Sequence, residues 1–498
     1  MLAAQFADMT STSSSGRILA LAVLASLYTA PADAQQGEGI VSCRVAGIPH
    51  EARCGHVTRP LDPARPGGVG IDVHYVVVPA IARSKVAEPI FLIAGGPGQS
   101  AIDVAPSVMP LFQRLNQRRD IVFVDQRGTG RSAPLACDDE RALSLAEQAD
   151  LDLAVARLDR CRRALQALPY GDLRFFTTSL AMDDLDAVRV RLGAARIDLV
   201  AVSYGTRAAL EFLRRHPRHV RRVVLDGVAP PDMALPASMS GDAEAALAAL
   251  FQACADEAAC AQRHGTLRAD WESMLARLPQ PVTAAHPLTG RTESFTLTRE
   301  MLLQAVRQAL YVPAWAAALP QALQDAAHGR YEPLFGLASI RAGRRASTPA
   351  MGMHFSVLCA EDAPLLSGTV DAPGASFGTS FGRLYQRVCE PWPKADVPAS
   401  FREVPTSPVP ALLLSGGLDP VTPPRHGERV ARALGARARH VVVPNAGHGV
   451  LSVGCMSVVL HRFIEEEDDV KALAVDAGCA QRVPRPGVFV PPDPAGAR

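Results

Sequence analysis

The 498-residue sequence predicts an α/β fold in which helices flank a mostly parallel sheet. Short continuous apolar runs bounded by turn residues are typical of strands that are buried on both faces. The segments between them carry apolar residues every three or four positions, which predicts amphipathic helices. Because the two patterns alternate along the chain, we expect parallel strands joined by right-handed crossovers.

Composition and charge exclude several classes of function. The chain is 48% hydrophobic and 20% charged, as is ordinary for a globular protein, and its length allows two or three domains. Its formal net charge is +1, and no long acidic or basic block occurs, so we expect no nucleic-acid partner. Peptides or other small molecules are the expected substrates. The oligomeric state has no signature in the sequence.

The N-terminus has the pattern of a signal peptide over residues 1–34. Arg17 precedes an apolar run over 18–30, and a small-x-small motif ends at Ala34, where we expect cleavage. The run is too short to span a bilayer, so we expect export to the periplasm or the medium without stable membrane insertion. An uncleaved anchor is the alternative, and Met9 is an alternative start.

Ten cysteines in an exported chain indicate disulfide bonds. Local spacing favours pairing between sequence neighbours. The expected pairs are Cys43–Cys54, Cys137–Cys161, Cys254–Cys260, Cys359–Cys389 and Cys455–Cys479. A zinc site formed by Cys43, His50, Cys54 and His56 is the alternative at the first pair, but this spacing matches no common zinc pattern.

The first predicted strands surround a glycine-rich loop. An early strand is expected over 71–78 and a buried strand over 89–94, which runs into the loop G-G-P-G-Q-S at 95–100. No G-K-[ST] follows, so the loop is not a P-loop. A further buried strand over 120–125 leads into D-Q-R-G-T-G-R-S at 125–132.

Helical patterns fill the next part of the chain and end at a sharp turn. Residues 138–170 are rich in Ala, Leu and Arg, and Thr178 or Ser179 is expected to cap the following helix, which ends at Gly193. A strand over 197–202 then meets a helical segment with Ser203 between them.

Ser203 lies in the pattern of a nucleophile elbow. Such a turn holds the serine in a strained backbone conformation that exposes its hydroxyl, and its neighbours must be small so that strand and helix can approach. Gly205 satisfies this need, whereas Ala201 replaces the usual first glycine.

Three motifs together carry a family resemblance. G-G-P-G-Q-S, D-Q-R-G-T-G-R-S and V-S-Y-G-T resemble those of the proline iminopeptidase and tripeptidyl aminopeptidase branch of the α/β-hydrolases. The resemblance covers most of the mature chain and implies an α/β-hydrolase fold. It also suggests that Asp125 and Arg127 brace the oxyanion loop.

The sequence pattern changes after a strand over 222–226. Helix-like segments and one strand-like patch, over 293–298, follow it. In this family an insertion here carries a cap, so we expect a mainly helical cap over 233–405 between core segments 35–232 and 406–498. A separate, unrelated domain is the alternative.

Two late strands end in loops of chemical interest. The strand over 409–415 leads to Asp419 in G-G-L-D-P-V-T-P, and the strand over 439–443 leads to His448 in P-N-A-G-H-G. The carboxyl ends of parallel strands share one edge, so both residues should lie near Ser203. The segment after Val450 resembles the C-terminal region of tripeptidyl aminopeptidases.

Ser203, Asp419 and His448 supply nucleophile, acid and base in the chain order of this fold. Asp226, which also ends a strand, is the alternative acid. The N–H groups of Gly96 and Tyr204 are the expected oxyanion donors. This chemistry needs no metal and no organic cofactor.

The resemblance implies an exported aminopeptidase that releases proline or short di- and tripeptide units from peptide N-termini. Such an enzyme must bind a cationic amine, and Glu361 and Asp362 are the candidate carboxylates. Their alternative role is that of a solvated charge pair. An esterase or amidase is the second function considered, and an inactive binding protein the third.

Overall fold

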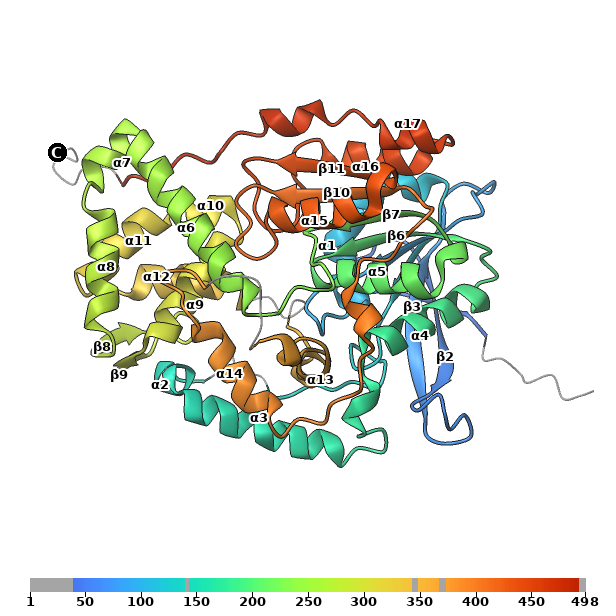
Figure 1. Cartoon of the computed structure of the whole chain (residues 1–498), viewed down its shortest axis with the longest axis horizontal. Helices are drawn as coiled ribbons and strands as arrows, with labels where there is room; N and C mark the ends of the chain where they lie inside the picture. Colours follow the sequence, from blue (N-terminus) through green and yellow to red (C-terminus); the bar gives the residue numbers. More distant parts are fainter. Residues whose placement is uncertain (1–38, 139–142, 343–347, 367–372, 492–498) are drawn as a thin grey trace, which may run out of the picture. The chain divides into compact units, whose positions relative to one another are not determined.

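The core of the protein is one mixed sheet, seen in the computed structural model of Figure 1. Residues 39–138, 143–342, 348–366 and 373–491 are described, and the chain from Ile40 onward forms one compact unit. Within these residues the sheet has nine strands in the order β1-β2-β3-β5-β4-β6-β7-β10-β11. Their bounds are Val41–Cys43, Ala52–Pro60, Gly70–Val78, Ile121–Val124, Ile90–Ile93, Ile197–Val202, Val220–Asp226, Ala411–Gly416 and Ala438–Val443, in that order.

Six neighbouring strands, from β5 to β11 in this order, are parallel, which confirms the predicted class. Strands β1, β2 and β3 are antiparallel to their neighbours and extend one edge. The sequence analysis missed β1 and β2. Most of their residues are exposed or half-buried, so neither strand has the continuous apolar run of a buried strand.

Helices cover both faces of the sheet. Helices α1 (Ala101–Phe112) and α16 (Met456–Glu465) pack on one face. Helices α4 (Thr178–Arg191), α5 (Tyr204–Arg215) and α15 (Pro424–Leu434) pack on the other.

The N-cap of α4 corrects a detail of the sequence analysis. Its side-chain cap is Thr177, which accepts a hydrogen bond from the Leu180 N–H, and not Thr178 or Ser179. Thr178 instead donates hydrogen bonds to Glu361.

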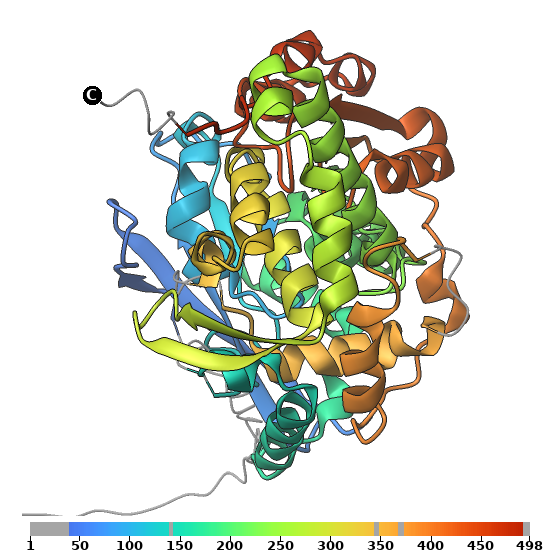
Figure 2. The ribbon, with the colours of Figure 1, turned by 90° about the vertical axis from the view of Figure 1, so that its left-hand side faces the viewer.

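Between β7 and β10 the described chain is mainly helical and has a hydrophobic core of its own. We call this part of the chain the cap segment. Figure 2, in which this segment faces the viewer, shows α6 passing in front and the β8–β9 ribbon below it. The elements are α6 (Ser238–Asp256), α7 (Ala258–Arg263), α8 (Leu267–Arg277), β8 (Gln280–Ala285), β9 (Thr292–Leu297), α9 (Arg299–Leu310), α10 (Pro313–Ala316), α11 (Leu319–Ala327), α12 (Glu332–Ala342), α13 (Met351–Glu361) and α14 (Ser380–Cys389). Strand β9 confirms the predicted strand-like patch, and the cap boundaries at 233 and 405 stay a prediction.

Three further helices complete the described chain. Helices α2 (Leu145–Ala149) and α3 (Leu151–Gln166) lie in the predicted helical stretch, and α3 contacts α14 of the cap segment. Helix α17 (Asp469–Leu473) follows α16.

All five predicted disulfide pairs are present. Cys43 and Cys54 are therefore bonded to each other and do not offer thiolates to zinc, which overturns the alternative reading of that region. The predicted signal peptide over 1–34 lies outside the described residues.

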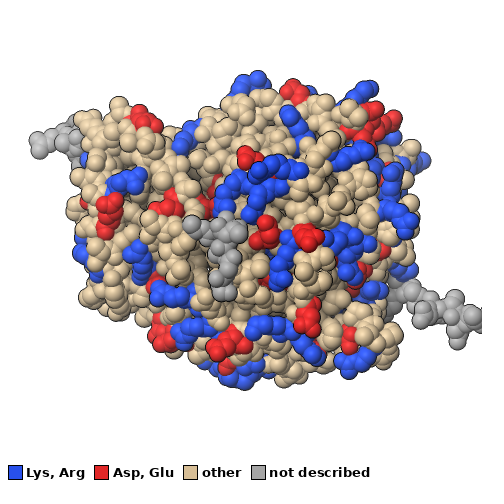
Figure 3. Space-filling view, viewed as in Figure 1, with Lys and Arg blue, Asp and Glu red and all other residues tan. Residues whose placement is uncertain are grey.

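Figure 3 shows acidic and basic side chains interspersed over the face it presents. None of the helices in the described ranges combines the length and apolar character needed to cross a membrane.

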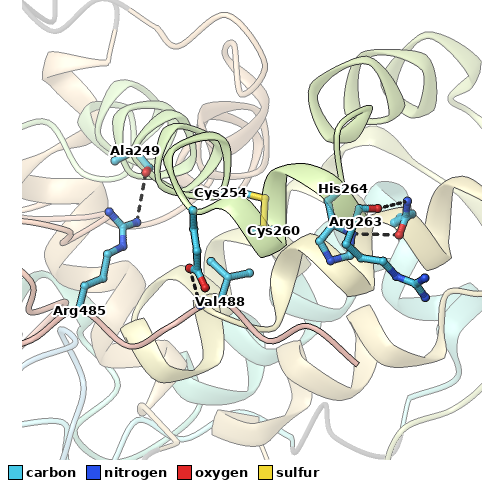
Figure 4. The surroundings of a disulfide bond; sticks show 9 residues. Ala249, Cys254, Cys260, Arg263, His264, Arg485 and Val488 are labelled. Atoms are coloured by element: carbon cyan, nitrogen blue, oxygen red, sulfur yellow. Dashed lines mark hydrogen bonds between the residues drawn. A yellow bond between two sulfur atoms is a disulfide. The ribbon is translucent and has the colours of Figure 1, made fainter. Parts of the chain in front are cut away.

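The C-terminal segment runs back from the core to the cap segment (Figure 4). The Arg485 guanidinium donates to the Ala249 carbonyl in α6, and the Val488 N–H donates to the Glu257 carboxylate. The Phe489 N–H donates to the Ala317 carbonyl, 2.8 Å away. The bonds of Arg485 and Val488 lie beside the Cys254–Cys260 disulfide (Figure 4), and they link this segment to α6 and to Glu257 at the start of α7.

Candidate active site

Ser203 occupies a strained turn between β6 and α5. Its φ angle is +58°, and the only other residue besides glycine with positive φ in the described part of the chain is Ala133. Such a conformation costs free energy, which is typical of a nucleophile elbow. Gly205 is required here because a Cβ at this position would overlap the carbonyl of Ile93 at the end of β4.

Ala201 shows why the first elbow glycine is dispensable. It lies in β6, pairs with Ile93 and Leu225 in the neighbouring strands, and is fully buried. Its methyl group belongs to the apolar core on the α5 face of the sheet, so it fills core space without crowding the turn.

His448 and Asp419 meet at the carboxyl edge of the sheet, each in a loop that follows a parallel strand. The His448 Nδ1 lies 2.8 Å from Asp419 Oδ2, the distance of a strong hydrogen bond. The aspartate is buried, whereas the imidazole keeps 11% of its side chain exposed. This pairing fixes the ring and leaves Nε2 to act as a base.

Thr422 completes this pair, and the sequence analysis did not find it. Its hydroxyl donates to Asp419 Oδ2 at 2.8 Å and lies 3.1 Å from His448 Nδ1. The N–H groups of Val421 and Thr422 donate to Asp419 Oδ1. Burial alone would raise the pKa of Asp419, but the nearby His448 and these donors outweigh it and lower the pKa.

Ser203 and His448 lie on either side of the chain that leaves β7. The Ser203 N–H donates to the Asp226 carbonyl at 2.9 Å. A Cβ added to the next residue, Gly227, would lie 3.3 Å from the Cε1 of His448. Within the described chain no hydrogen bond joins the Ser203 hydroxyl to His448 Nε2. In hydrolases this contact often tightens only when substrate binds.

Asp226, the alternative acid, has other partners. Its carboxylate accepts the N–H groups of Val450 and Leu451 at 2.9 to 3.0 Å and makes no hydrogen bond to His448. Burial raises the pKa of Asp226 to about 6. The geometry therefore favours Asp419 as the partner of the base, and Asp226 holds the backbone that follows His448.

The two expected oxyanion donors lie on neighbouring loops. Tyr204 is the first residue of α5, so its N–H has no partner within the helix, and Gly96 is exposed with φ +112°. A Cβ at Gly95 would lie 3.1 Å from the Cβ of Ser203, which brings the glycine-rich loop against the elbow. Neither N–H is bonded to an acceptor among the described residues, so both stay candidates for an oxyanion.

Asp125 braces the glycine-rich loop, whereas Arg127 lies elsewhere. The buried Asp125 carboxylate accepts the Ser100 hydroxyl at 2.7 Å and the Ile102 N–H at 3.1 Å. Arg127 forms a buried ion pair with Asp184 of α4. The expected support of the loop therefore comes from the aspartate alone.

Glu361 and Asp362 differ from the sequence expectation. Both side chains are buried: Glu361 accepts two hydrogen bonds from Thr178, and Asp362 accepts both from Arg207 and from the Leu235 N–H. A cationic amine would have to displace these partners. The pair is neither solvated nor free in a cleft. Glu361 links the end of α13 to the start of α4, and Asp362 links it to α5.

Among the described residues, one group of side chains could hold a metal, and it lies far from Ser203. Asp186, His216 and His219 offer ligand atoms within 4.8 Å of one another at the C-terminal end of α5. Each already has a protein partner, since His219 contacts Asp186 and His216 contacts Asp183. The elbow lies about 18 Å away along the helix, so the group takes no part in chemistry at Ser203.

The fold and these loops agree with a family comparison. The model of the alpha/beta hydrolase fold matches residues 88–454, about three quarters of the chain. This chain belongs to the α/β-hydrolase family. The match includes the strand before the glycine-rich loop and ends after His448, so it contains every candidate for the triad and the oxyanion hole.

Several α/β-hydrolase relatives carry names of peptidases or esterases. A tripeptidyl aminopeptidase of Streptomyces lividans is 31% identical over 37% of this chain, which spans only 36% of that relative. Serine protease Hip1 of Mycobacterium tuberculosis is 27% identical over 78% of this chain and 80% of its own. Carboxylesterase B of the same species is 28% identical over 83% and 84%. The resemblance to tripeptidyl aminopeptidases is confirmed, and peptidase and esterase names both occur.

Proposed function

We propose that this α/β-hydrolase is an exported serine aminopeptidase that releases proline or short di- and tripeptide units from peptide N-termini. The observation that carries the proposal is the 2.8 Å bond from His448 to the buried Asp419 beside a serine in a strained elbow. The relatives named tripeptidyl aminopeptidase and serine protease support the choice of peptides.

In the proposed reaction the Ser203 hydroxyl attacks the scissile carbonyl while His448 Nε2 accepts its proton. The N–H groups of Gly96 and Tyr204 stabilise the negative oxygen of the tetrahedral intermediate. His448 then passes the proton to the leaving amine. A water molecule, deprotonated by His448, hydrolyses the acyl-enzyme and restores Ser203.

Export is part of the proposal. The five disulfides suit an oxidising compartment, and the predicted signal peptide would direct the chain there. Cell fractionation of the full chain, followed by N-terminal sequencing of the mature protein, tests it. Cleavage after Ala34 is expected, and a cytoplasmic protein that keeps residues 1–34 would contradict it.

An esterase or amidase is the second candidate, because a specific observation favours it. The buried state of Glu361 and Asp362 removes the carboxylates expected to bind a substrate amine. A relative named carboxylesterase also covers most of the chain.

A substrate panel separates the two candidates. We expect hydrolysis of proline, alanine or tripeptide anilides with a free N-terminus, and slower hydrolysis of their N-blocked forms. Turnover of aryl esters without cleavage of any free-amine peptide would exclude the peptidase. Ser203→Ala should abolish all of these activities, and full activity in that variant would overturn the serine mechanism.

A further inference from the structure

Helix α13 is linked to both segments that carry the candidate oxyanion donors. Its N-terminal end is bonded to the glycine-rich loop with Gly96. At its C-terminal end, Glu361 is bonded to Thr178, whose hydroxyl meets that of Tyr204. The next residue, Asp362, is bonded to Arg207 of α5. The helix spans Met351–Glu361, about 16 Å in length. The proposed mechanism gives this helix no role.

At the N-terminal end, two bonds hold consecutive carbonyls of the glycine-rich loop. The Ala350 N–H donates to the Gly98 carbonyl at 2.8 Å. His354 Nδ1 lies 3.1 Å from the Pro97 carbonyl, which can only accept, so Nδ1 carries the proton. Nε2 then accepts from the hydroxyl of Tyr385, 2.9 Å away.

At the C-terminal end, a short polar chain reaches the residue after the nucleophile. Glu361 accepts the Thr178 N–H and hydroxyl, each at 2.8 Å. Because that hydroxyl proton is engaged, the Tyr204 hydroxyl donates to Thr178 Oγ1 at 2.6 Å. Asp362 adds a buried ion pair to Arg207 in the first turn of α5.

The helix itself is held against movement. The Gly352 N–H donates to the Leu135 carbonyl, and Trp392 donates to the Ser356 hydroxyl. A disulfide joins Cys359, near its end, to α14. Because the rise per residue of an α-helix is fixed, the residues at the two ends of α13 stay at a fixed distance from each other.

We propose that α13 is a brace that sets the separation of the two oxyanion N–H groups, with His354 and Glu361 as positioning residues at its ends. The inference rests on the proposed serine hydrolase function. It gives a role to the buried Glu361, which the sequence analysis had assigned to amine binding. It also predicts that substitutions at either end of α13 weaken the stabilisation of the oxyanion and leave the binding of the substrate ground state unchanged.

The test removes the bond at the N-terminal end and then restores it. His354→Ala should lower kcat about 10- to 100-fold and change KM less than about 3-fold. This fall in kcat is at most that expected from removing one oxyanion donor. The Ki of phenylboronic acid, which forms a tetrahedral adduct with the serine, should rise by the same factor. His354→Asn keeps a donor near the Nδ1 position and should recover most of the loss.

A matched control and a second variant complete the design. His264 is a buried histidine of the cap segment, outside the candidate site, and its side chain is bonded to Gln324. His264→Asn should therefore leave kcat and Ki unchanged. Tyr204→Phe breaks the chain at the other end and keeps the test open if His354→Ala does not fold. Combined with His354→Ala, its effect should be less than multiplicative, because either change alone loosens the brace.

Two results would overturn the brace. One is a folded His354→Ala with wild-type kcat and boronate Ki, and the other is a fully multiplicative double variant. Loss of all activity in Ser203→Ala in the same experiment shows that the proposed function still holds. If Ser203→Ala keeps activity, the proposed function fails first, and the brace fails with it.

Discussion

At the scale of single residues, the candidate site depends on which carboxylate contacts which partner. Asp419 accepts from His448 and from its own turn, whereas Asp226 accepts two N–H groups just beyond the histidine. Both are buried at the same edge of the sheet. The partners of these hydrogen bonds distinguish a residue that orients the base from one that holds its loop.

Substitution of these two aspartates should show the difference. Asp419→Asn should lower kcat by about 10⁴-fold, because the amide favours the wrong tautomer of His448. Asp226→Asn keeps one acceptor for the backbone and should lower kcat less than about 10-fold. Steady-state kinetics on the best substrate of the panel gives both values. The reverse order would assign the acid to Asp226.

Glu361 should impose a pH dependence on stability. Burial raises its pKa from 4.5 to about 7. Between these values the folded protein binds the proton more tightly than the unfolded chain does, so the free energy of unfolding falls as pH rises. Glu361→Gln removes this contribution. The free energy of unfolding of the variant minus that of wild type should therefore rise by roughly 3 kcal/mol between pH 4.5 and pH 7.5.

Urea unfolding of both proteins at pH 4.5, 6 and 7.5 measures this difference. Glu467→Gln, a change of an exposed carboxylate outside the site, is a suitable control. A constant difference between Glu361→Gln and wild type across the range would contradict the raised pKa.

At the scale of elements, helices and loops of the cap segment hold the catalytic loops in place. Helix α13 contacts the glycine-rich loop, and the Tyr311 carbonyl just after α9 accepts the His448 N–H at 3.0 Å. The Tyr311 ring also lies edge-on to the His448 ring. The cap segment therefore contributes to the geometry of the site.

The C-terminal segment should stabilise this arrangement. A chain that ends after Pro484 loses the hydrogen bonds of Arg485, Val488 and Phe489 to the α6, α7 and α10 region. We expect faster amide hydrogen exchange in α6 and α7 and a Tm lowered by a few degrees. A chain that ends after Pro491 keeps these bonds and is the control. Equal exchange in the two truncated proteins would contradict the role of the segment.

At the scale of the whole molecule, disulfides connect neighbouring elements across both the core and the cap segment. Cys43–Cys54 joins the edge strand β1 to its neighbour β2, and Cys359–Cys389 joins α13 to α14. All ten cysteines are paired, and no free thiol is left. Each bond restricts the unfolded chain and so stabilises the folded one.

Thiol counting checks this arrangement. The unreduced protein, denatured in urea, should show no reactive thiol, and full reduction should release ten. Reduction should lower stability by several kcal/mol, because each native disulfide typically contributes about 2–5 kcal/mol. A reactive thiol in the unreduced protein would show that one of the five pairs does not form.

Much of the fold could be predicted because it follows from local patterns. Continuous apolar runs predict β4, β5, β6, β7 and β10, and the small residues around Ser203 predict the elbow. The disulfides also follow from sequence spacing. Each of these signals lies within a few tens of residues and depends on the backbone preferences and polarity of neighbouring residues.

The tertiary structure decided the properties that depend on distant contacts. The sequence alone places Asp226, Asp419, Glu361 and Asp362 in suggestive loops, but burial and partners assign their roles. Asp419 lies against His448, whereas Glu361 contacts Thr178, which is 183 residues away in the sequence. A carboxylate in a sequence has no fixed environment, and only the packing of remote elements determines whether it binds substrate, orients a base or supports a helix.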